Sequence, residues 1–288
     1  MSHLTEEQRT FLDKKAEEIR ETIIRMLAAG GGHTAGSLGM ADIFTAFYFH
    51  ILNHDPKNPE WPDRDRLILS NGHITPVRYA AMAHAGYFPV EECLTLRKFG
   101  SRLQGHPERD KLPGIETTSG PLGSGLSQAS GIAYGAKMDG KKFRTYCFLS
   151  DGELQEGNSW EGAMFAGANR LSNLTAIIDR NNIQITGDTE DIMPLEPLAD
   201  KWRAFNWHVI EIDGHNIEEV VDAIEQAKAI REKPTMIIAH TIPGKGVKDI
   251  EGDYRWHGNP PGKGPTDKVP AADQERVFLE EIRESAKK

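Results

Sequence analysis

The N-terminal part of the chain has apolar residues at helical spacing. Thr5 and Gln8 stand in the arrangement of a capping box, and the apolar positions beyond them recur at the intervals of a helix. Three glycines at 30–32 end this helix, because glycine favours left-handed and irregular backbone. A second helix is predicted over 40–52. We therefore expect residues 1–60 to be a helical decoration on the main domain.

From residue 66 onward, short apolar runs alternate with helical patterns. The predicted strands are Arg66–Ser70, Thr145–Ser150, Leu174–Asp179, Trp207–Ile212 and Pro234–His240. The predicted helices are one through Tyr79 and Met82, then Asn158–Arg170, Leu195–Phe205, Ile217–Arg231 and a polar C-terminal helix at about 271–287. Strands that alternate with helices require crossover connections. This predicts an α/β fold, with a parallel twisted sheet and helices on both faces, in one domain spanning 1–288.

Composition and charge exclude several classes of protein. Of the 288 residues 38% are hydrophobic, and 34 Lys and Arg against 43 Asp and Glu give a net charge of −9. That balance argues against a nucleic-acid or anionic-membrane surface. Cys93 and Cys147 are far apart, which excludes a disulfide framework and favours a reducing cytoplasm. With a polar N-terminus and no apolar run near about eighteen residues, we expect neither a secretory signal nor a membrane span.

Polar residues follow two of the predicted strands at their carboxyl ends. Asp151 and Gly152 come directly after one strand, and Asn181 follows the next. Ligands of parallel sheets bind at this edge, and carboxylate, amide and main-chain oxygens suit Mg²⁺, which also binds phosphate oxygens. Gly152 would let a diphosphate approach the main chain near a helix N-terminus. The alternative is that Asp and Asn simply end strands and cap helices.

Glycine and histidine coincide in several predicted loops. The glycine-rich segment 118–125 (TSGPLGSG) favours close approach of the main chain to a flat ligand, with a plain tight turn as the alternative. It lacks the dinucleotide fingerprint, so a nicotinamide site is disfavoured. The histidines that adjoin glycine include four candidates, namely His33, His73, His106 and His257. Imidazole in a loop can move protons near neutral pH, and none of the four has the spacing of a zinc site.

Together and in this order, these segments resemble the N-terminal half of transketolase. The matching segments are Gly30–Ile43, Arg66–His73, Gly100–Glu108, Thr117–Ala133, Ser150–Gly187 and Gly244–Gly258. The resemblance implies a cytoplasmic transferase of the pentose phosphate pathway that moves a two-carbon ketol unit from a ketose phosphate to an aldose phosphate. Its implied cofactors are thiamine diphosphate and Mg²⁺, with Ca²⁺ or Mn²⁺ as substitutes.

The resemblance also assigns roles by position. The metal ligands would be Asp151, Asn181 and the main-chain carbonyl of Ile183. The residues in contact with the cofactor would be His73, Gly120, Pro121, Leu122, Gly152, Glu153, Asn181 and His257. The catalytic and substrate-binding residues, which hold sugar hydroxyls and assist proton transfer, would be His33, His106 and His257.

Two acidic residues also match family positions, and at two places the sequence differs from the family pattern. Glu156 and Glu161 correspond to a buried network near the family's subunit interface, or else they complement a helix dipole. Ser150 stands where the metal motif usually begins with glycine. Because this position precedes the proposed ligand Asp151, we expect a small side chain to be tolerated there. Thr34 and Ala35 replace a common Pro-Gly pair and would adjust the shape of the channel.

The matched region is only part of the family's usual chain. Full-length transketolases are more than twice as long, and their second α/β domain supplies the cofactor-activating glutamate and the arginines that hold the sugar phosphate. Only about thirty residues follow Gly258, too few for such a domain. We therefore expect the N-terminal subunit of a split transketolase, whose partner in an α2β2 heterotetramer is a separate C-terminal subunit. No nucleic-acid or membrane partner is expected.

Two alternatives stay open. A subunit similar to 1-deoxyxylulose-5-phosphate synthase or to a 2-oxoacid dehydrogenase would share the metal and diphosphate motif. The histidines at 33, 73, 106 and 257 favour transketolase over it. The other alternative is a non-catalytic scaffold subunit that retains the fold, and the intact metal and histidine positions argue against it.

Overall fold

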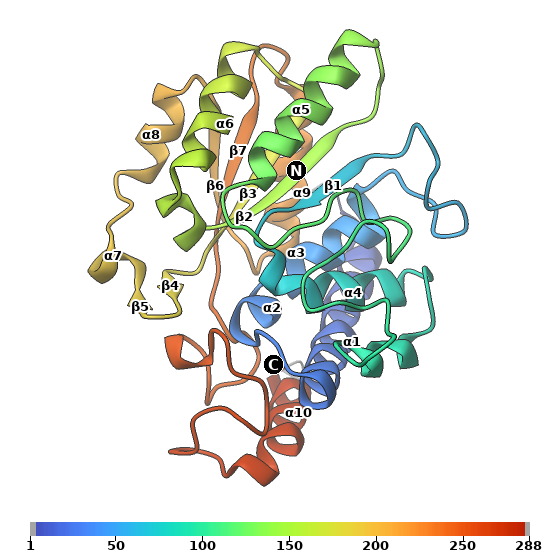
Figure 1. The fold of residues 1–288 in the computed structure, drawn as a ribbon, viewed down its shortest axis with the longest axis vertical. Helices are drawn as coiled ribbons and strands as arrows, with labels where there is room; N and C mark the ends of the chain where they lie inside the picture. Colours follow the sequence, from blue (N-terminus) through green and yellow to red (C-terminus); the bar gives the residue numbers. More distant parts are fainter. Residues whose placement is uncertain (1–3, 286–288) are drawn as a thin grey trace.

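Five parallel strands form the central sheet of the protein (Figure 1). The computed structural model describes residues 4–285. In spatial order the strands are β1 (Arg66–Leu69), β2 (Thr145–Ser150), β3 (Leu174–Arg180), β7 (Thr235–His240) and β6 (His208–Asp213). Each neighbouring pair is parallel. The central strands β2 and β3 are buried along their whole length, as strands with helices on both faces must be.

Helices cover both faces of this sheet. One face carries α1 (Glu6–Gly30), α3 (Ala41–Ala46), α4 (Thr75–His84) and α9 (Ile217–Ala229). The other face carries α5 (Gly125–Met138), α6 (Gly157–Ala168) and α8 (Leu198–Ala204). Alternate residues of a strand point to opposite faces, so Phe148 packs on Phe44 of the first layer while Leu149 joins the core of the second. The predicted α/β class is confirmed.

The first helix begins and ends as predicted. Thr5 Oγ1 accepts a hydrogen bond from Gln8 N–H at 3.2 Å, and Gln8 Oε1 accepts one from Thr5 N–H at 2.9 Å, which completes the capping box. At the other end Gly31 adopts a φ of 74°, and a Cβ atom at Gly30 would lie 2.2 Å from the carbonyl oxygen of Leu96. Only glycine allows this close approach.

Other predicted helices differ in detail. The helix expected over 40–52 is divided into α3 and a π-helical turn, and the short α2 (Ala35–Gly39) precedes it. The helix expected from Leu195 begins at Leu198, because Pro197 stands at its N-cap. The C-terminal helix α10 (Gln274–Ser285) is amphipathic rather than polar, since it buries Phe278, Leu279 and Ile282.

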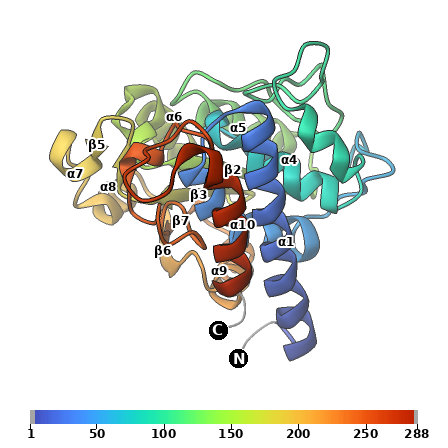
Figure 2. The ribbon, with the colours of Figure 1, turned by 90° about the horizontal axis from the view of Figure 1, so that it is seen from below.

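The α10 helix lies alongside α1 (Figure 2). The last residues of the predicted terminal helix, 286–288, lie outside the described residues. Among the α-helices and strands of the described residues, those not predicted are α2, α5, β4 (Ile183–Gln184), β5 (Gly187–Asp188) and α7 (Thr189–Ile192). No helix among the described residues is long and apolar enough to cross a membrane.

Candidate active site

A cavity of about 420 Å³ lies at the carboxyl ends of the strands. Eleven of its lining residues were predicted from the sequence: His33, His73, His106, Gly120, Leu122, Gly152, Glu153, Glu156, Asn181, Ile183 and His257. The structure therefore gathers residues that are more than 200 positions apart around one space. Of the remaining predicted residues, Asp151 is fully buried, and Pro121 and Glu161 do not line the cavity.

Three of the four predicted histidines form a compact cluster. The ring centroids of His33 and His73 are 5.0 Å apart, those of His73 and His257 are 5.1 Å apart, and those of His33 and His257 are 5.5 Å apart. Each ring comes from a different loop: the one after α1, the 3₁₀ turn after β1 and the segment after Trp256. His106 lies on the same side, since a Cβ atom at Gly120 would be 4.0 Å from its ring.

Burial keeps these histidines neutral at physiological pH. Burial, together with the neighbouring His257 and Arg97, lowers the pKa of His33 to about 4. Burial likewise lowers the pKa of His73 well below its ordinary value, and it lowers the pKa of His106 and of His257. A neutral imidazole can accept a proton or bind a hydroxyl group. His33 Nδ1 is buried without a hydrogen-bond partner, as expected of a group that meets a ligand.

The opposite wall is formed where β2 and β3 end. The register pairs Ser150 with Asp179, so Asp151 lies beside the residues that follow β3. Its Oδ2 accepts a hydrogen bond from Asn182 N–H at 2.6 Å and one from Arg180 Nη1 at 3.2 Å, and its Oδ1 accepts one from Gly152 N–H at 2.7 Å. Burial raises the pKa of Asp151 to about 6. The buried Arg180 stabilises the charged carboxylate, since opposite charges at this distance attract strongly.

Asn181 is oriented by two further contacts. Its Nδ2 donates to Asp179 Oδ2 at 2.8 Å, and its Oδ1 accepts from Ile183 N–H at 3.0 Å. Thr241 also donates to the Asp179 carboxylate, which is fully buried and whose pKa burial raises to about 7. The amide oxygen of Asn181 is thereby fixed beside Ile183.

The chemistry of this wall fits a hard divalent cation. The carboxylate oxygens of Asp151 and the amide oxygen of Asn181 accept only one or two hydrogen bonds each, so lone pairs remain for a metal. Carboxylate, amide and main-chain oxygens are the donors that Mg²⁺ prefers. Within residues 4–285 no cluster of three or more His, Cys, Asp or Glu is arranged to hold a metal.

Two glycines leave the cavity open between its walls. A Cβ atom at Gly152 would meet nothing closer than the Gln184 Cβ at 3.4 Å, and one at Gly120 would face only the ring of His106. Because both glycines line the cavity, any side chain there would occupy the space of a ligand. The main chain at these two positions is therefore accessible to a bound molecule.

Glu153 holds the glycine-rich loop in place. Its Oε1 accepts hydrogen bonds from the Ser70 hydroxyl and from Gly123 N–H at 2.6 Å, and its Oε2 accepts one from Ser150 N–H at 3.2 Å. The side chain is fully buried, and burial raises its pKa to about 7. One carboxylate thus joins the ends of β1 and β2 to the loop that follows His106.

Three cavity residues were missed from the sequence: Gln155, Gln184 and Ile185. Gln155 Nε2 donates to the carbonyl of Met193 at 3.1 Å, which connects the cavity to the segment after α7. Ile185 is exposed at the rim. Ile185 stands in the turn between β4 and β5, and no sequence pattern marked it as a cavity residue.

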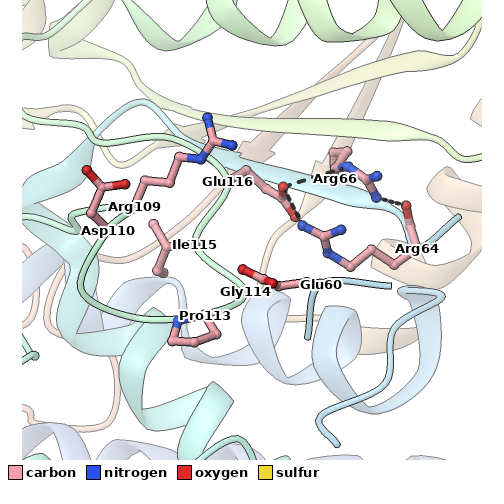
Figure 3. A pocket seen from close by; sticks show the side chains of 9 residues that line it. All are labelled: Glu60, Arg64, Arg66, Arg109, Asp110, Pro113, Gly114, Ile115 and Glu116. Atoms are coloured by element: carbon pink, nitrogen blue, oxygen red, sulfur yellow. Dashed lines mark hydrogen bonds and ion pairs between the residues drawn. The ribbon is translucent and has the colours of Figure 1, made fainter. Parts of the chain in front are cut away.

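A larger cavity, of about 580 Å³, lies elsewhere (Figure 3). It is near the amino end of β1, whereas the histidines lie near the carboxyl ends of the strands. Three of its charged residues are paired with one another, because Glu116 accepts from Arg64 Nη2 at 2.8 Å and lies 3.7 Å from Arg66 Nε. None of the predicted site residues lines it. The smaller cavity, which the predicted histidines and the residues after β2 and β3 line, is the candidate active site.

Fold and site together define an α/β enzyme domain with a polar, histidine-lined cavity at the carboxyl edge of its parallel sheet. A family model described as the transketolase thiamine diphosphate binding domain matches residues 14–273. The chain therefore belongs to the transketolase family. This confirms the family inferred from the sequence, and thiamine diphosphate is the cofactor bound by the matching domain.

Individual relatives agree with this assignment. The chain is 47% identical over 252 residues to the 6-deoxy-6-sulfo-D-fructose transketolase subunit SqwG of Clostridium sp. (strain MSTE9), covering 87% of this chain and 92% of that protein. It is 41% identical over 275 residues to an apulose-4-phosphate transketolase subunit of Actinobacillus succinogenes, covering 95% and 96%. Rat transketolase is 42% identical over 81% of this chain, which spans only 37% of that protein.

Solved structures give the same result. Transketolase from Leishmania mexicana superposes with a TM-score of 0.82 at 31% identity, and the match covers 96% of this chain and 45% of that one. Transketolase from Campylobacter jejuni superposes with the same TM-score at 34% identity. These similarities confirm that the chain is a subunit of a transketolase-type transferase, not of the synthase-like or dehydrogenase-like alternatives.

Proposed function

We propose that this chain is the cofactor-binding subunit of a two-chain transketolase whose active site a separate C-terminal subunit completes. The observation that carries the proposal is the cavity that four neutral histidines line together with Asn181 and Ile183, beside the buried carboxylate of Asp151. Relatives of nearly the same length are themselves named as transketolase subunits. The partner would supply the activating glutamate and the arginines that hold the sugar phosphate.

The metal in this proposal is Mg²⁺, held by Asp151, Asn181 and the carbonyl of Ile183. The proposed contacts of the cofactor are His73, Gly120, Pro121, Leu122, Gly152, Glu153, Asn181 and His257. When bound, thiamine diphosphate supplies the electron sink that breaking and forming a carbon–carbon bond requires. Glu153 acts by holding the glycine-rich loop against the ends of the strands.

The histidines handle the sugar in this proposal. His33, His106 and His257 would bind its hydroxyl groups and carry protons to and from them, because all three are neutral near pH 7. The donor would be a ketose that ends in a strong acid, since two relatives matched over more than 90% of their own length are named for a sulfo sugar and a sugar phosphate. A place in the pentose phosphate pathway and a cytoplasmic setting remain parts of the proposal.

The proposed assembly is an α2β2 heterotetramer. Glu156 and Glu161, which the resemblance places in a buried network at a subunit interface, are exposed in the single chain. Their burial would therefore require a second subunit. Leu122 and Ile185 are likewise exposed at the rim of the cavity, where a partner would cover them.

A transfer assay tests this function. The chain is purified with the product of the neighbouring reading frame, and ketol transfer between a ketose phosphate and an aldose phosphate is measured for each chain and for the mixture. We expect turnover only from the mixture. Full activity from the isolated chain contradicts the two-chain proposal, and release of carbon dioxide from pyruvate supports a synthase-like or dehydrogenase-like reaction instead.

Cofactor binding is tested separately by calorimetry. Mg²⁺-dependent binding of thiamine diphosphate to the complex should be lost in Asp151→Ala, which removes the proposed ligand. Asp139→Ala, at the exposed C-terminal end of α5, should bind normally and serves as the matched control. Absence of binding in the unaltered complex would favour a non-catalytic scaffold.

A further inference from the structure

Arg97 stands in an unusual position beside the histidine side of the cavity. It follows the 3₁₀ turn Val90–Thr95 and has a φ of 59°, in the left-handed region that residues other than glycine seldom occupy. Its N–H donates to the carbonyl of Leu103 at 2.9 Å, which fixes the turn. An uncommon backbone conformation at a charged residue near a cavity calls for a functional explanation.

The guanidinium of Arg97 lies over Gly105. A Cβ atom at Gly105 would be 2.6 Å from Nε and 2.9 Å from Cζ of Arg97, so the glycine makes room for the arginine. Gly105 immediately precedes His106, a cavity residue. The side chain of Arg97 therefore lies against the main chain next to His106, one of the predicted substrate-binding histidines.

Arg97 also has no acidic partner among residues 4–285. Its neighbour Arg102, by contrast, donates to both oxygens of Glu92, at 2.6 and 3.0 Å. The positive charge of Arg97 acts on the cavity, where it lowers the pKa of both His33 and His106.

Acidic and basic groups lie at different places around the cavity. Glu153 and Glu156 line it together with the proposed metal ligands Asn181 and Ile183. Arg97 is exposed just outside the lining, with its guanidinium against Gly105 and so next to the lining residue His106. A planar guanidinium with unpaired donors recognises phosphate-like anions by paired hydrogen bonds.

We propose that Arg97 binds the strongly acidic terminal group, a phosphate or a sulfonate, of the sugar substrate and so contributes to its selection. This inference rests on the proposed transketolase function. It assigns to this chain part of the binding of the acidic group, which the resemblance to transketolase places wholly in the partner subunit.

The test is the kinetics of the two-chain enzyme with three ketose donors: D-fructose 6-phosphate, 6-deoxy-6-sulfo-D-fructose and uncharged D-fructose. Arg97→Gly removes the guanidinium and suits the left-handed backbone, so the turn should be retained. We expect at least a tenfold rise in KM for both acidic donors, with kcat changed less than about twofold and with D-fructose unaffected. Arg97→Lys should recover part of the loss.

A second variant moves the arginine without removing it. Gly105→Ala places a methyl group against the flexible end of Arg97, so the side chain must shift while the fold remains. We expect the same selective rise in KM, at smaller size. Arg109→Gln is the matched control, because Arg109 lies at the other cavity (Figure 3). An equal loss with all three donors, or an effect of Arg109→Gln as large as that of Arg97→Gly, overturns the proposal.

A binding experiment separates this inference from the transfer reaction itself. Inorganic phosphate and sulfate are each titrated into the full chain while the C2–H resonance of His106, assigned with His106→Gln, is followed by NMR. The resonance should shift to saturation in the unaltered protein and in Arg97→Lys but not in Arg97→Gly. A shift that persists in Arg97→Gly overturns the inference whether or not the complex transfers ketol groups, whereas an inactive complex with a normal phosphate response overturns only the proposed function.

Discussion

Neutrality is the common property of the histidines at the candidate site. Three rings with centroids within 5.5 Å would repel one another if they were charged, and burial removes the water that would screen them. The cluster is therefore stable only while its members are unprotonated. This links the chemistry of single residues to the stability of the whole chain.

His33 gives a measurable pH dependence. Its pKa is lowered from 6.5 to about 4 in the folded chain, so the unfolded chain takes up a proton first as the pH falls. The contribution of His33 to the free energy of unfolding is therefore fully present above pH 6.5. It falls as the pH decreases towards 4, by about 3 kcal/mol at most. Urea unfolding at pH 7 and pH 5 should show the loss, and His33→Asn should reduce it. An unchanged pH dependence in that variant would contradict the assignment.

Arg180 is the second residue on which the site depends. Besides Asp151 it contacts Thr189 at 3.0 Å, Glu190 at 2.8 Å and Glu196 at 2.9 Å, and its side chain is only 3% exposed. One guanidinium thus balances the buried Asp151 and attaches the segment after β3 to the proposed metal ligand.

Arg180→Met should leave the Asp151 carboxylate buried without its cation. Breaking a buried pair in this way costs about 3–5 kcal/mol, so the free energy of unfolding should fall by that order at pH 7. Arg180→Met combined with Asp151→Asn should recover most of the loss, because the carboxylates that still lack their cation, Glu190 and Glu196, are largely exposed to solvent. Arg203→Met, which removes an exposed pair with Asp200, should cost less than about 1 kcal/mol. Simple additivity of the two buried changes would refute the coupling.

Among the helices, α5 is the longest that the sequence pattern did not predict. Gly131 and Gly135 interrupt its apolar pattern, and glycine in a helix interior lowers helix propensity. The helix forms nonetheless because Leu126, Ala129 and Ala133 pack on the sheet. Tertiary burial outweighs local propensity here.

The two glycines of α5 can be replaced in the single chain without a clash. A Cβ atom at either position would meet nothing within 4 Å. Gly131→Ala and Gly135→Ala should each raise the free energy of unfolding of the isolated chain by about 0.5–1 kcal/mol, measured by urea titration. Gly167→Ala is the contrasting case, because its Cβ would lie 1.9 Å from the carbonyl oxygen of Phe205, and it should destabilise the chain.

The strands were predicted to within one residue at most ends, because buried parallel strands are continuous apolar runs. Asp151, Asn181 and the histidines were found because chemically distinctive residues stand in loops at one edge. Arg97, Gln184 and Ile185 were not found, since their importance depends on contacts between distant segments. The same is true of the function of Glu153 as a link between loop and strands.

At the scale of the whole molecule, one face retains apolar surface that the chain itself does not cover. Tyr134 and Met138 of α5 and Met164 and Phe165 of α6 are between 38% and 71% exposed, and the rings of Tyr134 and Phe165 are 5.6 Å apart. Contiguous apolar surface of this kind marks an interaction site more often than isolated exposed residues do. Glu161 lies on the same helix, where the proposed subunit interface would bury it.

A charge on this face should therefore weaken the assembly. Phe165→Glu places a carboxylate where a second copy of the chain would exclude water, and burying an unpaired charge opposes association. We expect analytical ultracentrifugation of the two-chain complex to show a shift from the α2β2 mass towards half of it. Phe11→Glu is the matched control, because Phe11 is similarly exposed but lies on α1, on the other face of the sheet. If both variants sediment as the unaltered complex does, the subunit interface does not involve α6. If the unaltered complex already has half the expected mass, the α2β2 proposal is wrong, because a cofactor site shared by two of each chain needs the larger assembly.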